Sequence, residues 1–343
     1  MKSIIDLLPR DLLKKCKKIA QPSFIPPMLA TLTDDYFSSN DWIYEHKYDG
    51  VRALMFKKNG SVQLISRNRN SMNNSYPEIA QALEQQTSDN FIMDGEIVAL
   101  DGSISNFELL QSRINLQDLE SIKSKSKKVP IAVCIFDLMY VDGYDIRALP
   151  LLVRKELLKK LLHYNHILLY SQHISGDGIK FFHKACKAKW EGVMAKKIDS
   201  AYLGKRSRDW LKFKCIMQQE LVIGGYTSPE GARKNFGALL VGYYDKGKLR
   251  YAGKVGTGYD HATLAMLGKK LKALETDKCP FVDFDISPRG VHWVKPQLVA
   301  EFQFAQWTRA GKLRVGRYKG LRTDKKAKDV VKETPKHLAG IPK

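Results

Sequence analysis

Lys47 lies near the start of the chain in the segment EHKYDGVR at residues 45–52, which follows the apolar and aromatic run WIY. The amine of Lys47 could act as a nucleophile toward phosphorus if burial or neighbouring cations lower its pKa. That chemistry also needs a divalent cation and basic side chains on the phosphate oxygens. The alternative is a solvent-facing Lys47 beside a hairpin tip at Asp49-Gly50. Residues further along the chain favour the interpretation of Lys47 as a nucleophile.

The other groups that this chemistry needs lie in or beside predicted strands. They are carboxylates, an aromatic ring and a pair of lysines. Glu96 lies at one strand tip, Phe136 near the end of a buried strand, and Glu191 before another strand. In the segment WLKFK the alternation places Lys212 and Lys214 on one face of a strand. Two lysines side by side repel each other unless an anion lies between them. The pair therefore predicts a site for phosphate.

The overall charge favours a polyanionic partner. The 343 residues hold 57 basic and 36 acidic side chains, so the formal net charge is 57 − 36 = +21. Gly178–Cys215 contains eleven Lys/Arg and three acids, and Arg309–Lys343 contains twelve and three, giving +8 and +9. A scatter of lysines can be a solvated surface, but clusters of this density favour contacts to nucleic-acid phosphates.

Several classes of protein are excluded by composition. The hydrophobic fraction of 44% is that of a folded globular chain, and no apolar run is long enough to span a membrane. The N-terminus lacks the apolar core of a secretory signal. The five cysteines are widely spaced and form no CxxC pair, so we expect neither a disulfide nor a zinc site, and a reducing compartment.

Periodicity predicts an α+β chain in two parts. The first twenty residues read as one basic amphipathic helix, ended by prolines at positions 22, 26 and 27. Residues 121–128 read as a Lys/Ser-rich loop. Short strands separated by turns fill residues 42–98, a buried strand covers 131–141, and helices are expected over residues 77–84, 106–119, 149–162 and 179–189.

The pattern of predicted helices and strands changes after Cys215. Three short strands with glycine turns are followed by a helix at residues 261–275 and a further strand at 298–308. This order fits the five-stranded, partly open barrel that binds oligonucleotides, the OB-fold. A β-sandwich with an inserted helix is the alternative on pattern alone. We expect the two parts to join near residues 216–220.

Six segments occur in the order of the nucleotidyltransferase motifs of ATP-dependent DNA ligases and mRNA capping enzymes: EHKYDGVR, SRNRN, MDGE, FDLMYVDG, EGVMAKK and WLKFK. Further segments, among them PPMLATL, GALLVGYYD, YAGKVGTG and LRVGRYKGLRTDK, resemble the ligase domain of the bacterial end-joining ligase D family. The resemblance covers residues 22–335. It implies a basic extension (1–21), an adenylation domain of antiparallel sheets and helices (22–216), an OB-fold domain (217–335) and a tail (336–343).

The resemblance also implies roles for individual residues. Lys47 would form a lysyl-AMP phosphoramidate, and Asp324 and Lys325 would act with it in catalysis by orienting the pyrophosphate leaving group. A divalent cation, Mg²⁺ or Mn²⁺, would bind Glu191 and Asp49. The remaining contacts to ATP and the 5′-phosphate would come from Glu45, Arg52, Arg67, Glu96, Phe136, Lys212, Lys214 and Arg322. Lys196 and Arg314 would be further phosphate contacts.

Structural interpretations compete with some of these roles. On sequence alone Phe136 reads as core, and Asp94 and Asp137 read as turn or capping residues. His46 reads as a neutral packing or surface residue. Two positions depart from the family pattern, since Gly316 replaces the usual proline and Thr323 the usual glutamate.

The resemblance implies an ATP-dependent DNA ligase that seals 5′-phosphate, 3′-hydroxyl breaks in nicked or broken duplex DNA, in repair that includes non-homologous end joining. It implies a monomer in the bacterial cytoplasm, associated with the nucleoid and working with the Ku end-binding protein. The polymerase and phosphoesterase domains typical of that family do not fit in 343 residues, so we expect a stand-alone ligase. The alternatives are an RNA ligase, a capping-type guanylyltransferase, and a non-catalytic DNA-end binding module.

Overall fold

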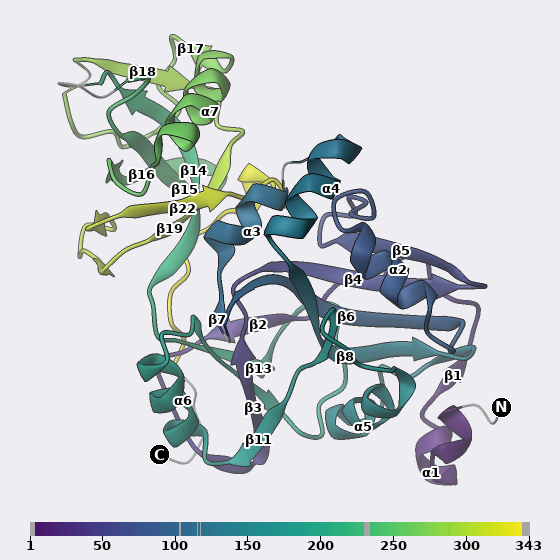
Figure 1. The fold of residues 1–343 in the computed structure, drawn as a ribbon. Coiled ribbons are helices and arrows are strands. Elements are labelled where there is room, and N and C mark those ends of the chain that lie inside the picture. Colours follow the sequence, from purple (N-terminus) through teal and green to yellow (C-terminus); the bar gives the residue numbers. More distant parts are fainter. Residues whose placement is uncertain are drawn as a thin grey trace. The chain divides into compact units, whose positions relative to one another are not determined.

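The chain folds into two compact units (Figure 1). The computed structural model describes residues 4–102, 104–114, 116, 118–229, 234–287 and 289–337. Unit 1 comprises Met1–Cys215 with Thr334–Lys343, and unit 2 comprises Ile216–Glu333. The first three residues of the expected extension and residues 338–343 of the expected tail lie outside the described residues. In the described part, no helix has the length and apolarity needed to cross a membrane.

Unit 1 is built on two sheets. Sheet A has the order β1-β9-β8-β6-β4-β5, with β10 added to β8 and β7 to β6. Its strands are β1 (Lys17–Lys18), β4 (Val51–Lys58), β5 (Ser61–Ser66), β6 (Asn90–Asp101), β7 (Ile104–Ser105), β8 (Ile131–Val141), β9 (Tyr144–Asp145) and β10 (Leu168–Tyr170). Sheet B has the order β11-β3-β12-β13-β2. Its strands are β2 (Leu29–Leu32), β3 (Ser39–Lys47), β11 (His173–Gly176), β12 (Gly192–Lys197) and β13 (Arg206–Lys214).

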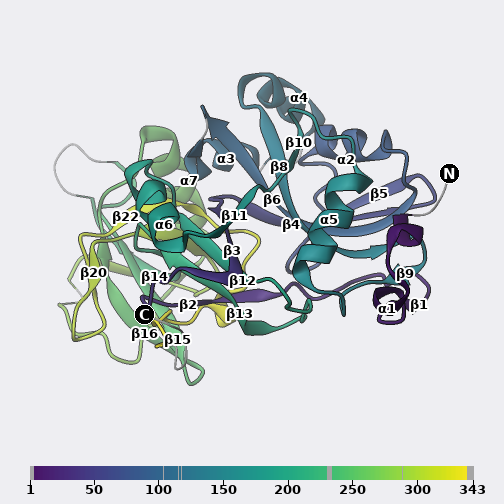
Figure 2. The ribbon, with the colours of Figure 1, turned by 90° about the horizontal axis from the view of Figure 1, so that it is seen from below.

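The alternation of side chains gives each sheet two different faces. In Figures 1 and 2, β4, β6 and β8 run side by side in sheet A. The odd-numbered residues of β4, such as Ala53 and Met55, pack against the helices of the main core. The even-numbered Leu54 and Phe56 join a second cluster with Phe136 of β8 and Trp210 of β13. This second cluster lies between sheets A and B, beside the candidate site.

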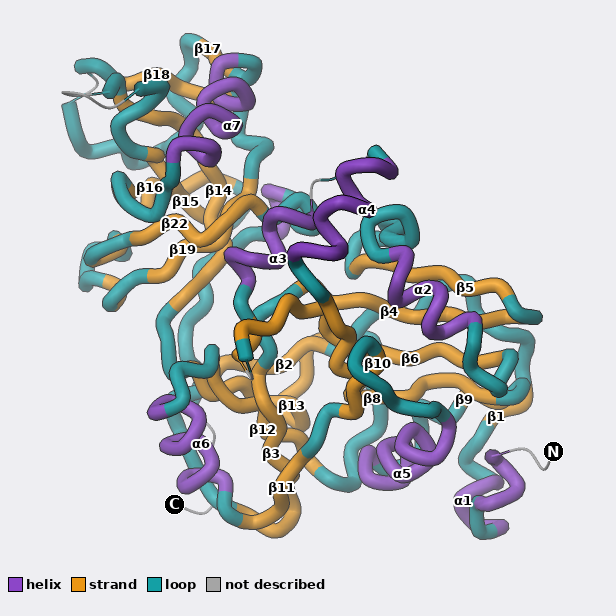
Figure 3. The backbone as a smooth tube through the Cα atoms, in the orientation of Figure 1, coloured by secondary structure: helices purple, strands orange, loops and turns teal. Residues whose placement is uncertain are grey.

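The helices cover the outer faces of the sheets (Figure 3). They are α2 (Pro77–Glu84), α3 (Phe107–Ile114), α4 (Leu119–Lys128), α5 (Leu151–Leu161) and α6 (Gly178–Lys187). α2, α3 and α5 contribute to the core on sheet A, and α6 packs on sheet B. The expected loop at residues 121–128 is wrong, because this segment is helix α4. Asp118 caps it by accepting a hydrogen bond from the Ser121 amide, and Ile122 is buried beneath it.

The N-terminal segment is broken rather than one helix. A 3₁₀ turn, η1 (Ile4–Leu7), and a short helix, α1 (Arg10–Leu13), flank Pro9, which cannot continue a helix. Ile5 is buried, and Leu8, Leu12 and Leu13 pack against the main core of unit 1. These residues therefore belong to the packing of unit 1.

The expectation of no disulfide is also wrong. Cys186 of α6 and Cys215, which follows β13, are joined with their Cα atoms 5.1 Å apart. They are separated by 29 positions in the sequence. The packing of α6 on sheet B brings the end of the helix to the end of β13, which the spacing of cysteines could not indicate.

Unit 2 is a curved antiparallel sheet with a helix, in agreement with the expected OB-fold architecture. Its elements are β14 (Gln218–Thr227), β15 (Leu239–Asp245), β16 (Lys248–Val255), α7 (His261–Lys272), β17 (Glu275–Thr276), β18 (Val291–Val294), β19 (Val299–Gln303), β20 (Gln306–Trp307), β21 (Leu313–Arg314), β22 (Arg317–Leu321) and a 3₁₀ turn, η2 (Ala327–Asp329). β14 pairs with β15, β18 and β19, and β22 pairs with β19. The Tyr318 amide donates to the Thr257 carbonyl at 3.0 Å, which brings β22 back to the end of β16. The expected strand at 298–308 is interrupted at residues 304 and 305.

Candidate active site

Lys47 lies in a row of residues that crosses three strands of sheet B. It is directly opposite Gly192 of β12, which is directly opposite Lys214 of β13. Residues opposite each other on neighbouring strands project to the same face. Because Gly192 has no side chain, the two lysines face each other across an open position. A Cβ atom on Gly192 would lie 1.9 Å from the Phe213 carbonyl oxygen, so only glycine fits there.

A second row lies beside the first on the same face. Glu45 is opposite Met194, which is opposite Lys212. The two rows bring together Glu45, Lys47, Lys212 and Lys214 from segments far apart in the sequence. The alternation predicted for Lys212 and Lys214 thus becomes a paired arrangement with the candidate nucleophile.

The Lys47 amine forms an ion pair with the Glu191 carboxylate. Burial lowers the pKa of Lys47, but Glu191 raises it by more, so the net pKa lies above its ordinary value. The positive charge of Lys214 acts in the opposite direction and lowers it. We expected a lowered pKa, and the contact with Glu191 is the physical reason for the difference.

The two carboxylates near this amine fit a magnesium-type ion. Glu191 contacts Lys47, and the charge of Asp49 also acts on it. Among the described residues, no group of three or more His, Cys, Asp or Glu side chains could hold a metal. Mg²⁺ commonly uses one or two protein carboxylates together with substrate phosphates and water, so two are sufficient.

Glu45 is held between two buried lysines. One carboxylate oxygen accepts from Lys155 of α5, and the other accepts from Lys196 at 2.6 Å. Burial raises the pKa of Glu45, but these two lysines lower it by more, so the net pKa lies below its ordinary value. Lys155 also donates to the Ser171 carbonyl at 3.0 Å. The carboxylate is therefore fixed in position.

Arg52 faces this group from sheet A. Its guanidinium donates to both oxygens of Asp94, at 2.9 Å and 2.5 Å. Tyr202 donates to the same carboxylate at 2.6 Å. Burial lowers the pKa of Arg52, but Asp94 raises it by more, so the arginine stays charged. Glu96 is opposite Arg52 in the β4–β6 register.

Phe136 lies where core and site meet. It is 9% exposed and belongs to the cluster between the sheets. The Arg52 guanidinium lies 5.3 Å from its ring centroid and the Lys196 amine 4.3 Å. Trp210 packs edge-on against it. The core interpretation is therefore correct for its packing, and its ring also faces the cations of the site.

Three further predicted residues lie in unit 2 and contact each other. Arg322 makes two hydrogen bonds to Asp324, both at 2.9 Å, and one to Glu301 at 3.0 Å. Lys325 forms an ion pair with Glu220 at 2.8 Å. Burial lowers the pKa of Arg322, but Asp324 and the neighbouring glutamates raise it by more. The motif is thus a connected cluster of charges within its own unit.

Arg67 and His46 lie outside these networks. Arg67 is half-buried in the turn that follows β5. His46 points to the opposite face of β3 from Lys47 and stacks on Trp190, with ring centroids 3.9 Å apart. Burial lowers the pKa of His46 to about 4, so it is neutral, as expected for a packing histidine.

Sequence reasoning missed several buried partners. Asp94 and Asp137 are not turn or capping residues but lie within strands, where they pair with Arg52 and Arg154. Lys155 was not singled out at all. Its signal was present, because it occupies the apolar face of α5 with Leu151 and Leu158 at helical spacing.

Comparison with known proteins agrees with this geometry. Residues 27–214 match the family described as ATP dependent DNA ligase domain, and residues 232–325 match ATP dependent DNA ligase C terminal region. Over 325 residues the chain is 35% identical to the multifunctional non-homologous end joining protein LigD of Pseudomonas aeruginosa, covering 93% of this chain and 38% of that protein. Over 327 residues it is 36% identical to the corresponding Mycobacterium tuberculosis protein, covering 93% and 41%. The chain spans about two fifths of the length of these relatives.

A more distant relative and a solved structure also match this chain. A DNA ligase of Sulfophobococcus zilligii is 32% identical over 321 residues, covering 86% of this chain and 53% of that one. The structure of mycobacterial DNA ligase D complexed with ATP and MES matches with a TM-score of 0.65 and 34% identity, covering 90% of this chain and 98% of that one. The two family matches and the sequence identities agree with the arrangement of side chains around Lys47. The chain therefore belongs to the ATP-dependent DNA ligase family.

Proposed function

We propose that this chain seals 5′-phosphate, 3′-hydroxyl breaks in duplex DNA through an AMP carried on Lys47. The amine attacks the α-phosphorus of ATP, a P–N bond forms, and pyrophosphate leaves. The DNA 5′-phosphate then takes the AMP from Lys47 and becomes a DNA-adenylate. Attack by the 3′-hydroxyl forms the phosphodiester and releases AMP. The observation that carries the proposal is the row Lys47, Gly192 and Lys214, with Glu191 in contact with the amine.

The residues around Lys47 suit these steps. Lys212 and Lys214 provide fixed positive charge for the α-phosphate, where negative charge increases in the transition state. Glu45 would bind the adenine edge from its position between Lys155 and Lys196. Phe136 would stack on the base.

The other proposed contacts serve the ribose, the DNA end and the leaving group. Arg52 and Glu96 would contact the ribose, and Arg67 the DNA 5′-phosphate. Arg322, Asp324 and Lys325 of unit 2 would orient the pyrophosphate. We assign the nucleophile and the AMP contacts to unit 1, the pyrophosphate contacts to unit 2, and DNA binding to both units.

Asp49 and Glu191 would hold Mg²⁺ or Mn²⁺. When bound, such an ion supplies positive charge at the phosphate oxygens. Occupation of Glu191 by a cation would weaken its contact with Lys47, leaving burial and Lys214 to lower the pKa of the amine. A neutral amine is the form that can attack phosphorus.

We further propose a role in the repair of double-strand breaks, with the Ku end-binding protein as partner, action as a monomer and a location at the bacterial nucleoid. Support comes from the relatives, which are named multifunctional non-homologous end joining protein LigD. A pull-down of purified Ku, with and without broken duplex DNA, tests the partner. Size-exclusion chromatography with light scattering tests the monomer.

Incubation with α-labelled ATP and a divalent cation tests the proposed reaction. We expect label on Lys47, found by peptide mapping, and its discharge by duplex DNA carrying a 5′-phosphorylated nick. Lys47→Arg keeps the charge but not the nucleophile and should take no label, whereas the exposed Lys58→Arg on neighbouring β4 should label normally. Labelling by GTP instead of ATP, or discharge only by RNA, would refute the DNA ligase reaction.

A further inference from the structure

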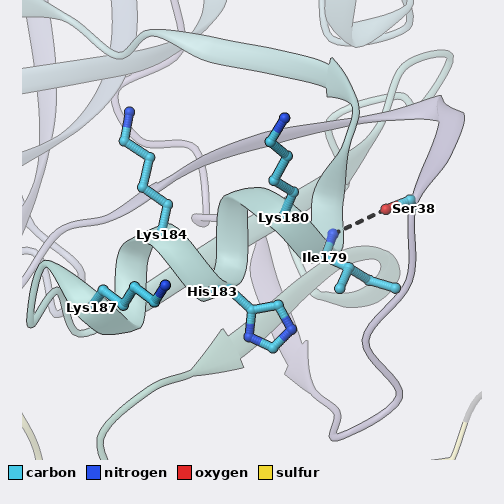
Figure 4. A pocket seen from close by; sticks show the side chains of 6 residues that line it. All are labelled: Ser38, Ile179, Lys180, His183, Lys184 and Lys187. Atoms are coloured by element: carbon cyan, nitrogen blue, oxygen red, sulfur yellow. Dashed lines mark hydrogen bonds between the residues drawn. The ribbon is translucent and has the colours of Figure 1, made fainter.

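Helix α6 presents a stripe of basic side chains on its outer surface. Lys180, His183, Lys184 and Lys187 are all exposed. Figure 4 shows Lys180 and Lys184 extending from the helix side by side. The opposite side of the helix is buried, because its Phe182 packs into the cluster on sheet B. This packing holds the helix, and with it the stripe, in place on sheet B.

Asp177, the N-cap residue of α6, is acidic, but no ion pair between it and these side chains is present in the described part of the chain. The sequence of α6 contains no acidic residue, and among the described residues none of the four side chains forms an ion pair. Lys180 and Lys184 are four residues apart, where like charges destabilise a helix. Lys180 also lies in the first turn, where the helix dipole disfavours a cation. An anionic partner would relieve both effects.

The stripe borders an open hollow. Its volume is about 610 Å³, and Ser38 and Ile179 complete its lining. The Ser38 hydroxyl accepts a hydrogen bond from the Ile179 amide at 3.0 Å, which fixes the start of the helix (Figure 4). The hollow is too open to enclose a small molecule. It is suited to a partner that passes along the helix.

The spacing of the lysines fits a phosphate backbone. Lys180 and Lys187 are seven residues apart, or about 10.5 Å along a helix that rises about 1.5 Å per residue. One strand of duplex DNA carries a phosphate about every 3.4 Å of its axis, so the stripe spans about three phosphates. We propose that α6 binds the phosphate backbone of duplex DNA through Lys180, Lys184 and Lys187.

This contact is separate from the chemistry, although it rests on the proposed function for the identity of its partner. Lys47 and Glu45 project from one face of β3, whereas His46 and Tyr44 project from the other, and Tyr44 packs in the same cluster as Phe182 of α6. The stripe thus lies on the side of sheet B away from Lys47. It adds affinity for DNA of any sequence, intact or nicked.

The test compares two triple variants. K180Q/K184Q/K187Q removes the stripe, and K125Q/K127Q/K128Q removes the same charge from the exposed last turns of α4. Binding to an intact 5′-fluorescent duplex is followed by anisotropy between 50 and 200 mM salt. Glutamine is nearly as good a helix former as lysine, and circular dichroism checks that both variants fold.

Each lost phosphate contact lowers the slope of log affinity against log salt by about 0.9. The α6 variant should therefore lose about 2.7 from the slope, so that between 50 and 200 mM salt the wild type loses about 40-fold more affinity than the variant. The α4 variant should keep most of the wild-type slope. A change below 1, or equal changes in both variants, would overturn the proposal.

A second readout separates this proposal from the proposed function. Labelling of Lys47 by ATP should proceed equally in the wild type and the α6 variant. If the wild type takes no label but the slope still falls in the α6 variant, the ligase reaction is wrong and the DNA contact stands. If labelling is normal and the slope is unchanged, only the DNA contact is wrong.

Discussion

Replacing Lys155 by methionine removes one of the two cations that hold the buried Glu45 carboxylate. The Lys155 amine donates to Glu45 and to the Ser171 carbonyl, and it is 1% exposed. An unsatisfied buried group costs about 1–3 kcal/mol, and breaking a buried ion pair costs about 3–5 kcal/mol. Because Lys196 still contacts Glu45, we expect a loss of about 3 kcal/mol in the free energy of unfolding at pH 7.

The pH dependence of that loss has a defined sign. Burial raises the pKa of Glu45, but Lys155 and Lys196 lower it by more, so the folded-state pKa is below the unfolded value of about 4.3. Such a group stabilises the fold above its unfolded pKa, and the contribution is lost as pH falls through the folded pKa. In Lys155→Met the pKa of Glu45 rises. The difference between wild type and variant should therefore stay constant from pH 7 to about pH 5, and shrink as the pH falls further through the pKa of the variant towards that of the wild type.

Urea unfolding at pH 7, pH 5 and pH 3 measures this effect. Hydrogen exchange of the β3 amides assigns it to unit 1. Lys160→Met is the matched control on the exposed side of α5 and should change stability by less than about 0.5 kcal/mol. Without Lys155 the Glu45 carboxylate is less well positioned to bind ATP. The KM for ATP in Lys47 labelling should therefore rise about tenfold, which corresponds to the loss of one oriented hydrogen bond. A loss below about 1 kcal/mol at pH 7, or one that grows at low pH, would refute the reasoning.

Three other changes test separate features of the site. Gly192→Ala places a Cβ atom 1.9 Å from a carbonyl oxygen of β13, so urea unfolding should show a loss of at least about 1–3 kcal/mol. Glu191→Gln removes the contact that raises the pKa of Lys47, so the pH at which this amine reacts with an acylating reagent should fall; an unchanged or higher midpoint would contradict the assignment. Reduction of the Cys186–Cys215 disulfide opens a loop of 29 residues and should lower the free energy of unfolding by about 3.5 kcal/mol, as measured in urea with and without reductant.

Much of the secondary structure and the set of candidate residues could be predicted from the sequence. α2 occupies Pro77–Glu84 as predicted, and β8 is buried along its whole length, because both signals are local. The loop expected at residues 121–128 was wrong, since the single apolar Ile122 was a weak local signal that only packing revealed. Local periodicity is reliable where several apolar residues support it.

The sequence by itself also determined which residue types surround the nucleophile. Glu45, Lys47, Lys212 and Lys214 were identified from their motifs, and alternation placed Lys212 and Lys214 on one face of a strand. What the motifs could not provide is the register between strands. Only the pairing of β12 with both β3 and β13 places Lys47 and Lys214 on either side of Gly192.

The tertiary structure alone decided which charges neutralise each other. Lys155 reaches Glu45 across 110 positions of sequence, and Lys196 across 151. Such partners are chosen by burial, because a carboxylate removed from water must find cations wherever the fold brings them. The disulfide and the pairing of Arg52 with Asp94 have the same origin. Chemistry of single residues can be predicted from sequence, whereas the electrostatic environment that tunes it depends on contacts between distant segments.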